Sequence, residues 1–101
     1  MSNGSHSIPA ADQRPCRANR SAFRVIGGEG LLMVIDRHEL HRLNSVGTRV
    51  FELCDGVATV DGIADAIARE FEVDLATARA DVQRFLSELS AAGAIGFGEP
   101  A

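Results

Sequence analysis

Two histidines and an aspartate are the residues most suggestive of chemistry. His38 and His41 form an HxxH pair two residues after Asp36, and these are side chains that metal sites use. If the segment is a β-strand, residues three apart point to opposite faces, so the two imidazoles cannot easily share an ion. No cysteine lies near enough in the sequence to complete a ligand set. We therefore expect solvated histidines and no metal.

Other candidates for catalysis or cofactor binding are weak. Cys54 lies in an apolar segment, which suppresses thiolate formation, and Cys16 is a free thiol in a polar stretch. The glycines of GGEG (27–30) precede a predicted strand, whereas phosphate binding needs a helix N-terminus. A phosphopantetheine carrier needs a serine after an aspartate, which VDGIADAI (60–67) lacks. The sequence predicts no enzyme and no cofactor.

Charge and hydropathy further restrict the kinds of protein and partner that the sequence allows. The 101 residues suit one domain, and the 14 acidic residues outnumber the 10 basic ones, all of them arginine. Residues 1–44 carry a net +2 and residues 45–101 a net −6, so the second half is a poor match for a phosphate backbone. The longest apolar run, residues 31–35, is far shorter than a membrane span, and the N-terminus does not resemble a secretory signal. We expect a cytoplasmic protein that contacts neither membrane nor nucleic acid.

The predicted secondary structure that would position any site changes from strands to helices after residue 43. Residues 22–26, 31–35 and 38–43 are predicted strands, the second buried on both sides and the third an edge strand of mixed polarity. Three helices are predicted next, capped by Asn44 or Ser45, by Thr59 and by Asp74. Asp55-Gly56 ends the first helix and Gly93 the third, and residues 95–97 can add a short extended segment.

This order predicts an α+β fold. A small three-stranded antiparallel sheet followed by three helices suggests a winged helix-turn-helix-like arrangement. Residues 1–20 are rich in Ser, Asn, Gly, Pro and Arg and are predicted to be a flexible N-terminal tail. Residues 21–98 form the predicted domain.

Two binding functions and one structural role are compatible with such a fold. In a DNA-binding winged-helix regulator the third helix would present Arg79 and Arg84, but Asp81 and Glu88 oppose phosphate contact. Peptide binding fits better, because residues 38–43 form an edge that can accept an extended peptide. Val82, Phe85 and Leu89 would line a groove beside that edge, unless they are only core. A structural subunit that docks on an enzyme is the third possibility.

The chain resembles the PqqD family, also called RiPP recognition elements, over residues 22 to 97. The resemblance rests on LNxxGxxVFxLxDG (43–56), TVxxI (59–63) and DVxxFLxxLxxxG (81–93) in this order and spacing. The stretch LLMVIDRHELHRLNSVG (31–47) is most similar to the stand-alone members of lasso-peptide and related pathways. Such members often have an aromatic residue in the third strand, where this chain has Leu40 and His41.

The resemblance implies a non-catalytic peptide chaperone. It would bind the leader segment of a ribosomally made precursor peptide and present it to a modifying enzyme, such as a radical SAM enzyme, a protease or a cyclase. The leader would add as an antiparallel strand to the third strand, beside the third helix, and the chain would be a monomer or a strand-paired dimer. The implied peptide-binding residues are Glu39, Leu40, His41 and Arg42 on the strand and Asp81, Val82, Arg84, Phe85 and Glu88 on the helix, with Leu40, Val82 and Phe85 forming apolar pockets.

Overall fold

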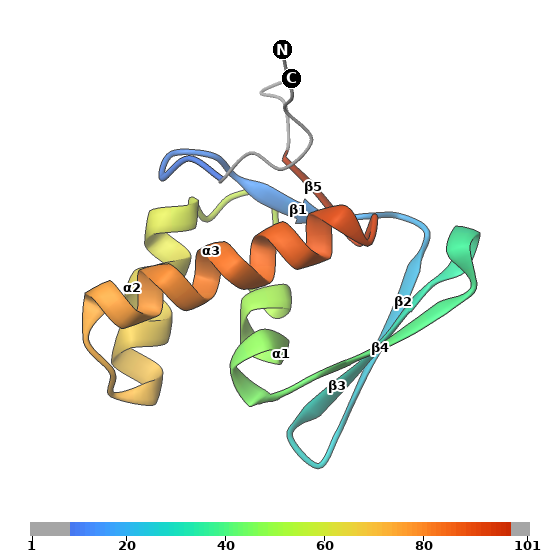
Figure 1. Ribbon diagram of the computed structural model, residues 1–101, viewed down its shortest axis with the longest axis horizontal. Coiled ribbons are helices and arrows are strands. Elements are labelled where there is room, and N and C mark those ends of the chain that lie inside the picture. The colour runs from blue at the N-terminus through green and yellow to red at the C-terminus, as the bar shows by residue number, and fades with distance from the viewer. Residues whose placement is uncertain (1–8, 98–101) are drawn as a thin grey trace.

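The structure, a computed structural model, describes residues 9–97 and confirms the predicted α+β fold. In chain order the elements are β1 (Pro15–Arg17), β2 (Ser21–Ile26), β3 (Glu29–Val34), the short 3-10 helix η1 (Ile35–Arg37), β4 (Glu39–Leu43), α1 (Ser45–Glu52), α2 (Val60–Phe71), α3 (Leu75–Ala91) and β5 (Ile95–Phe97). Strands β2, β3 and β4 form an antiparallel sheet in that order, and β1 pairs with β5 in a second, two-stranded sheet. In Figure 1 the larger sheet lies on one side of α1, and α2 lies on the other.

The three-stranded sheet has one covered face and one open face. On β3, Leu32 is fully buried and Val34 is buried, whereas Met33 between them is 38% exposed. The prediction that this strand is buried on both sides is therefore wrong. The reason is that the helices pack against only one face of the sheet, so successive side chains of the same strand alternate between core and solvent.

The helices begin where the sequence predicts. The side-chain oxygens of Asn44, Thr59 and Asp74 accept hydrogen bonds from the backbone N–H groups three residues later, at 2.8, 3.0 and 3.1 Å. Each bond satisfies one N–H group of a first turn that has no partner within the helix. Helix α1 ends at Glu52, earlier than the predicted Asp55-Gly56.

The core lies where the three helices meet the covered face of the sheet. Its largest fully buried side chains are Phe51, Leu32, Ile63, Ile67, Leu86, Val50 and Val82. Phe23 of β2 joins this core through a ring–ring contact with Phe51 of α1, with the centroids 4.7 Å apart. This contact packs β2 against α1.

The predicted N-terminal tail is wrong for residues 9–20. Pro15–Arg17 is strand β1 and pairs with β5, so Cys16 lies opposite Gly96. The carbonyl groups of Ala11 and Gln13 also accept hydrogen bonds from the first N–H groups of α2, at 3.0 and 2.9 Å. Local sequence does not reveal this pairing, because the partner strand is about 80 residues away along the chain. The part of the predicted tail before residue 9 lies outside the described residues.

Candidate functional site

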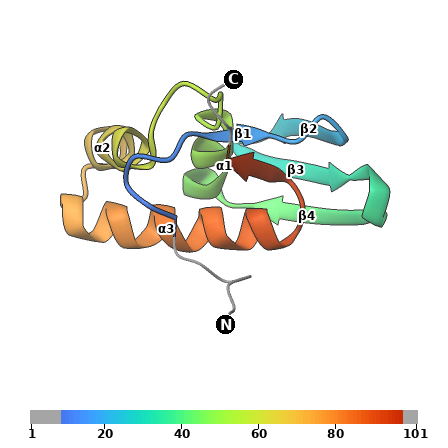
Figure 2. The same cartoon turned by 90° about the horizontal axis from the view of Figure 1, so that it is seen from above.

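Strand β4 is an edge of the three-stranded sheet. Within residues 9–97 it pairs only with β3, so the backbone groups on its other side meet no strand. Figure 2 shows β4 as the strand of this sheet nearest to α3, while β2, the opposite edge, lies farthest from it. A segment added to β4 would therefore run beside α3, and a segment added to β2 would not.

The register of β4 decides where each of its side chains points. His41 lies opposite the buried Leu32, so it shares the covered face of the sheet, as Glu39 does two residues earlier. Leu40 and Arg42 point to the open face, where Leu40 lies opposite Met33. The sequence-predicted strand residues therefore divide into two pairs with different surroundings.

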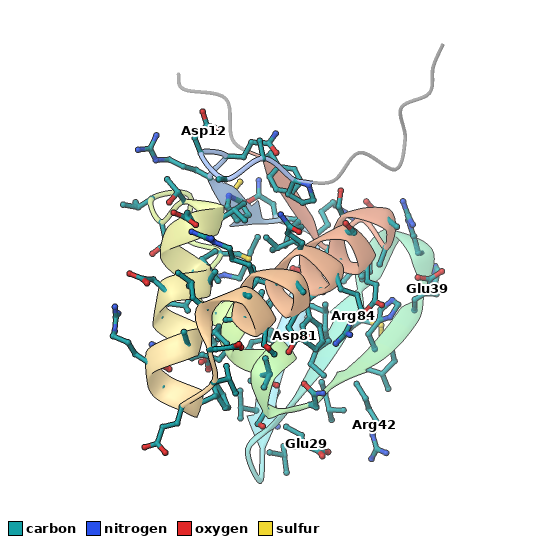
Figure 3. The ribbon with its side chains drawn as sticks, turned by 60° about the vertical axis from the view of Figure 1, so that its left-hand side comes forward. Asp12, Glu29, Glu39, Arg42, Asp81 and Arg84 are labelled. Carbon is teal, nitrogen blue, oxygen red and sulfur yellow. The ribbon has the colours of Figure 1, made fainter. Side chains whose placement is uncertain are left out.

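One side of α3 faces β4. Asp81, Arg84, Phe85 and Glu88 recur at helical spacing on this side, and Figure 3 shows Asp81 and Arg84 projecting from α3 toward β4. The other side of the helix is fixed by Arg79, whose Nε lies 3.1 Å from Asp61 Oδ1 of α2. The structure thus decides which flank of the third helix is available next to the free edge.

Phe85 is the one large apolar side chain on this flank and it is half-buried. Its ring lies against the first turn of α1 at Gly47. A Cβ placed on Gly47 would come within 2.6 Å of the ring, so only glycine leaves room for it. Gly47 is a candidate site residue that the analysis of residue types missed, although the glycine of the LNxxG motif is its signal in the sequence.

Two of the three predicted apolar pocket residues lie elsewhere. Val82 is fully buried in the core, so its side chain has no free surface to offer a ligand. Leu40 is 62% exposed but on the open face of the sheet, away from α3. Leu40 points to the open face because side chains alternate along a strand and its neighbours Glu39 and His41 point to the covered face. Val82 follows Asp81 by one residue, and this step around the helix turns its side chain inward toward α1 and α2.

Polar and charged side chains lie on the same sides of β4 and α3 as Phe85. Glu39 Oε1 lies 3.1 Å from His41 Nε2, and Asp81 Oδ1 lies 3.6 Å from Arg84 Nη2. Glu88 makes no ion pair within the described residues. We call these six residues, Glu39, His41, Asp81, Arg84, Phe85 and Glu88, the β4–α3 face. The Glu39–His41 hydrogen bond and the Asp81–Arg84 ion pair are largely open to solvent, so each stabilises the face only weakly.

One end of the β4–α3 face is closed by an arginine that the sequence did not single out. Arg37 of η1 donates from Nη1 to the carbonyl oxygen of Ala91 at 2.7 Å, at the C-terminus of α3. The positive guanidinium suits the negative end of the helix dipole. Gly93 lies against the same guanidinium, with 3.2 Å from a Cβ placed there to the nearest guanidinium atom. Arg37 thus joins the β3–β4 connection to α3 and keeps the edge strand beside the helix.

DNA recognition by α3 meets an electrostatic obstacle. Both arginines that the DNA-binding hypothesis requires are next to carboxylates, Arg79 to Asp61 and Arg84 to Asp81. Each carboxylate offsets the charge that would contact a phosphate. The structure therefore offers no basic surface on α3 to favour this alternative.

Groups that could do covalent chemistry are buried or dispersed. Burial raises the pKa of the Cys54 thiol to about 12, so this thiol stays protonated at neutral pH. His38 lies outside β4, in the left-handed conformation at the end of η1. Across residues 9–97 no cluster of three or more His, Cys, Asp and Glu side chains could hold a metal ion. In the same range no helix has the length and apolar character needed to cross a membrane.

Comparisons with known proteins point to one family. The family model described as coenzyme PQQ synthesis protein D (PqqD) matches residues 29–95. The solved structure of TbiB1 in complex with the TbiA(beta) leader peptide aligns with a TM-score of 0.73 at 25% identity, covering 83% of this chain and 99% of TbiB1. The solution structure of the PqqD truncation of Methylobacterium extorquens PqqCD, a stand-alone RiPP recognition element, aligns with a TM-score of 0.74 at 20% identity, covering 91% of this chain and 97% of the other. Among curated protein sequences no significant match is found.

Proposed function

Because the chain belongs to the PqqD family, we propose that it binds the leader segment of a ribosomally made precursor peptide and presents it to a modifying enzyme. Domains of this family are non-catalytic and bind peptides. The similar protein TbiB1 has been solved with a leader peptide bound, which supports the same ligand class for this chain. In this proposal the leader adds to β4 as an antiparallel strand.

The observation that carries the proposal is the free edge of β4 next to a semi-apolar flank of α3. An extended peptide at this edge gains main-chain hydrogen bonds whatever its sequence. Alternate peptide side chains then point toward α3, where Phe85 offers an apolar contact and Arg84 lies against the ring at 5.3 Å. Ordering a flexible leader costs free energy, which strand pairing and side-chain contacts together offset.

The residues of the proposed site have separate roles. The backbone of residues 39–42 pairs with the peptide. Phe85 supplies the apolar contact, and the charged residues of the β4–α3 face orient polar side chains of the leader. The outward-pointing Leu40 and Arg42 contact only those leader side chains that project to the open face. Binding between micromolar and nanomolar, about −8 to −12 kcal/mol, is expected for such a site.

An NMR titration of the labelled protein with the leader peptide encoded beside its gene tests the proposal. We expect saturable amide shifts that cluster on residues 38–43 and 79–89. Shifts confined to β2 would place the peptide on the other edge of the sheet. The absence of shifts at high micromolar peptide, together with loss of enzyme activity when the chain is removed, would favour a purely structural subunit.

Two matched phenylalanine variants separate binding from folding. Phe85→Ala and Phe71→Ala each remove a half-buried ring, but Phe71 lies on α2, away from β4. We expect Phe85→Ala to weaken leader binding about tenfold, about 1.4 kcal/mol, while Phe71→Ala leaves it within about twofold. Calorimetric titration measures both, and equal losses in the two variants would contradict a contact role for Phe85.

A further inference from the structure

The open face of the three-stranded sheet holds an apolar surface that leader binding at the β4 edge would touch only at Leu40 and Arg42. Two rows of cross-strand neighbours build it. Ala22, Met33 and Leu40 form one row, and Arg24, Leu31 and Arg42 form the next. We call these six residues the outer sheet face. Met33 is 38% and Leu40 is 62% exposed, high values for large apolar side chains that lie side by side.

The surface is hollowed at its centre. An open depression of about 260 Å³ is lined by Ala22, Phe23, Arg24, Leu31, Met33 and Leu40. All three strands contribute to it, so the depression is a property of the sheet and not of one mobile side chain. It has room for an apolar side chain of a partner.

The charge on this face is unlike that of the rest of the chain. Arg24 and Arg42 lie on either side of Leu31, two strand spacings or about 10 Å apart, and neither forms an ion pair within the described residues. Most other arginines of the folded part lie next to carboxylates or carbonyl groups. The one acid on the same face, Glu29, lies at the end of the β2–β3 hairpin and pairs with neither arginine. A positive surface thus lies on a chain whose formal net charge is −4.

A second copy of this chain does not suit the outer sheet face. A two-fold interface places the same patch of both copies together. That arrangement would bring Arg24 and Arg42 of one copy against Arg24 and Arg42 of the other, and like charges at a desolvated contact are repulsive. The complementary surface instead carries an apolar side chain between two carboxylates.

We propose that the outer sheet face is the docking surface for the peptide-modifying enzyme, which would present an apolar side chain flanked by Asp or Glu. The identity of this partner rests on the proposed function. Strand β4 belongs both to the β4–α3 face and to the outer sheet face. A leader strand added at β4 would extend the outer sheet face by one strand, so an enzyme seated there touches the sheet and the peptide together. Such a complex raises the local concentration of substrate at the enzyme.

The test uses substitutions away from β4, so that leader binding is measured independently. The variant Arg24→Glu/Met33→Glu changes β2 and β3 only. The matched control, Arg69→Glu/Val57→Asp, changes an exposed arginine and an exposed valine in the helical part, where Val57 is 74% exposed. Binding of the full-length chain to the peptide-modifying enzyme encoded beside its gene is measured by interferometry, and leader binding by calorimetry.

We expect the outer-face variant to weaken enzyme binding at least tenfold and to leave the leader dissociation constant within twofold. The control variant should behave as wild type in both assays, and added salt should weaken the wild-type complex. Because a double variant could perturb the sheet, Arg24→Glu alone is included, with an expected loss of at least threefold at an unchanged unfolding midpoint.

Three results would overturn the docking proposal. The first is enzyme binding that the outer-face variants leave unchanged. The second is leader binding that falls as much as enzyme binding, which would make this face part of the peptide site. The third is a wild-type dimer, seen by sedimentation, that the outer-face variant dissociates. If the leader fails to bind while enzyme binding depends on Arg24, the docking surface stands and the proposed leader site fails.

Discussion

The two faces of the three-stranded sheet are made by the same strands and yet behave as different surfaces. Leu32 and Met33 are neighbours on β3, but the first is fully buried and the second is 38% exposed. The covered face is part of the core, whereas the open face combines apolar side chains with two arginines that form no ion pair in the described part of the chain. The comparison shows that alternate residues of one strand can build the core and remain open to solvent at the same time.

The sharpest test of this comparison is to shorten the two neighbouring side chains. Leu32→Ala leaves a cavity in the core and should lower the free energy of unfolding by about 2–5 kcal/mol. Met33→Ala removes a side chain from an open surface and should cost less than about 1 kcal/mol. Urea denaturation followed by circular dichroism measures both values. Similar losses in the two variants would mean that the open face is covered in solution.

A second test addresses the contact between α1 and Phe85. Gly47→Ala adds a methyl group within 2.6 Å of the Phe85 ring and should destabilise the chain by about 1–3 kcal/mol, despite the better helix propensity of alanine. Gly62→Ala in α2 is the matched control, because a Cβ there meets only Thr59 Oγ1, at 3.3 Å. We expect the control to be close to neutral in the same denaturation experiment. A stable Gly47→Ala protein with unchanged Phe85 side-chain NMR signals would show that the ring has room.

The smallest expected effect is a change in stability with pH. It comes from Asp55, which lies between α1 and α2 and not in the three-stranded sheet. Hydrogen bonds from the backbone N–H groups of Ala58 and Val57 lower the pKa of Asp55 below its ordinary value of 3.8. A carboxyl whose pKa is lowered in the folded state stabilises the fold above its unfolded pKa, and this contribution is lost as the pH falls through the folded pKa.

We therefore expect wild type to lose more thermal stability than Asp55→Asn between about pH 6 and about pH 3. The amide of asparagine keeps an acceptor oxygen but does not titrate, so it isolates the charge. Melting temperatures at both pH values measure the difference. The same slope in both proteins would contradict a stabilising role for the Asp55 charge.

Much of the candidate site was predictable from sequence, but the sequence did not predict which sides of β4 and α3 face each other. The edge strand and the third helix were both predicted, and Asn44, Thr59 and Asp74 cap their helices as expected. Of the residues predicted to supply apolar pockets, Leu40 lies on the open face of the sheet and Val82 lies in the core. Periodicity identifies which residues share a side of one element, but it does not say how that side is turned toward a second element.

Local sequence decided the three helices and the strands of the larger sheet, because caps, turn glycines and apolar periods act within a few residues of the chain. The tertiary structure alone decided three other features: the pairing of β1 with β5, the flank of α3 that lies beside β4, and the open face of the sheet. Each depends on contacts between segments that are far apart in sequence, such as Arg37 with Ala91 or Cys16 with Gly96. No short window of residues contains both partners of such a contact, so local patterns cannot predict it.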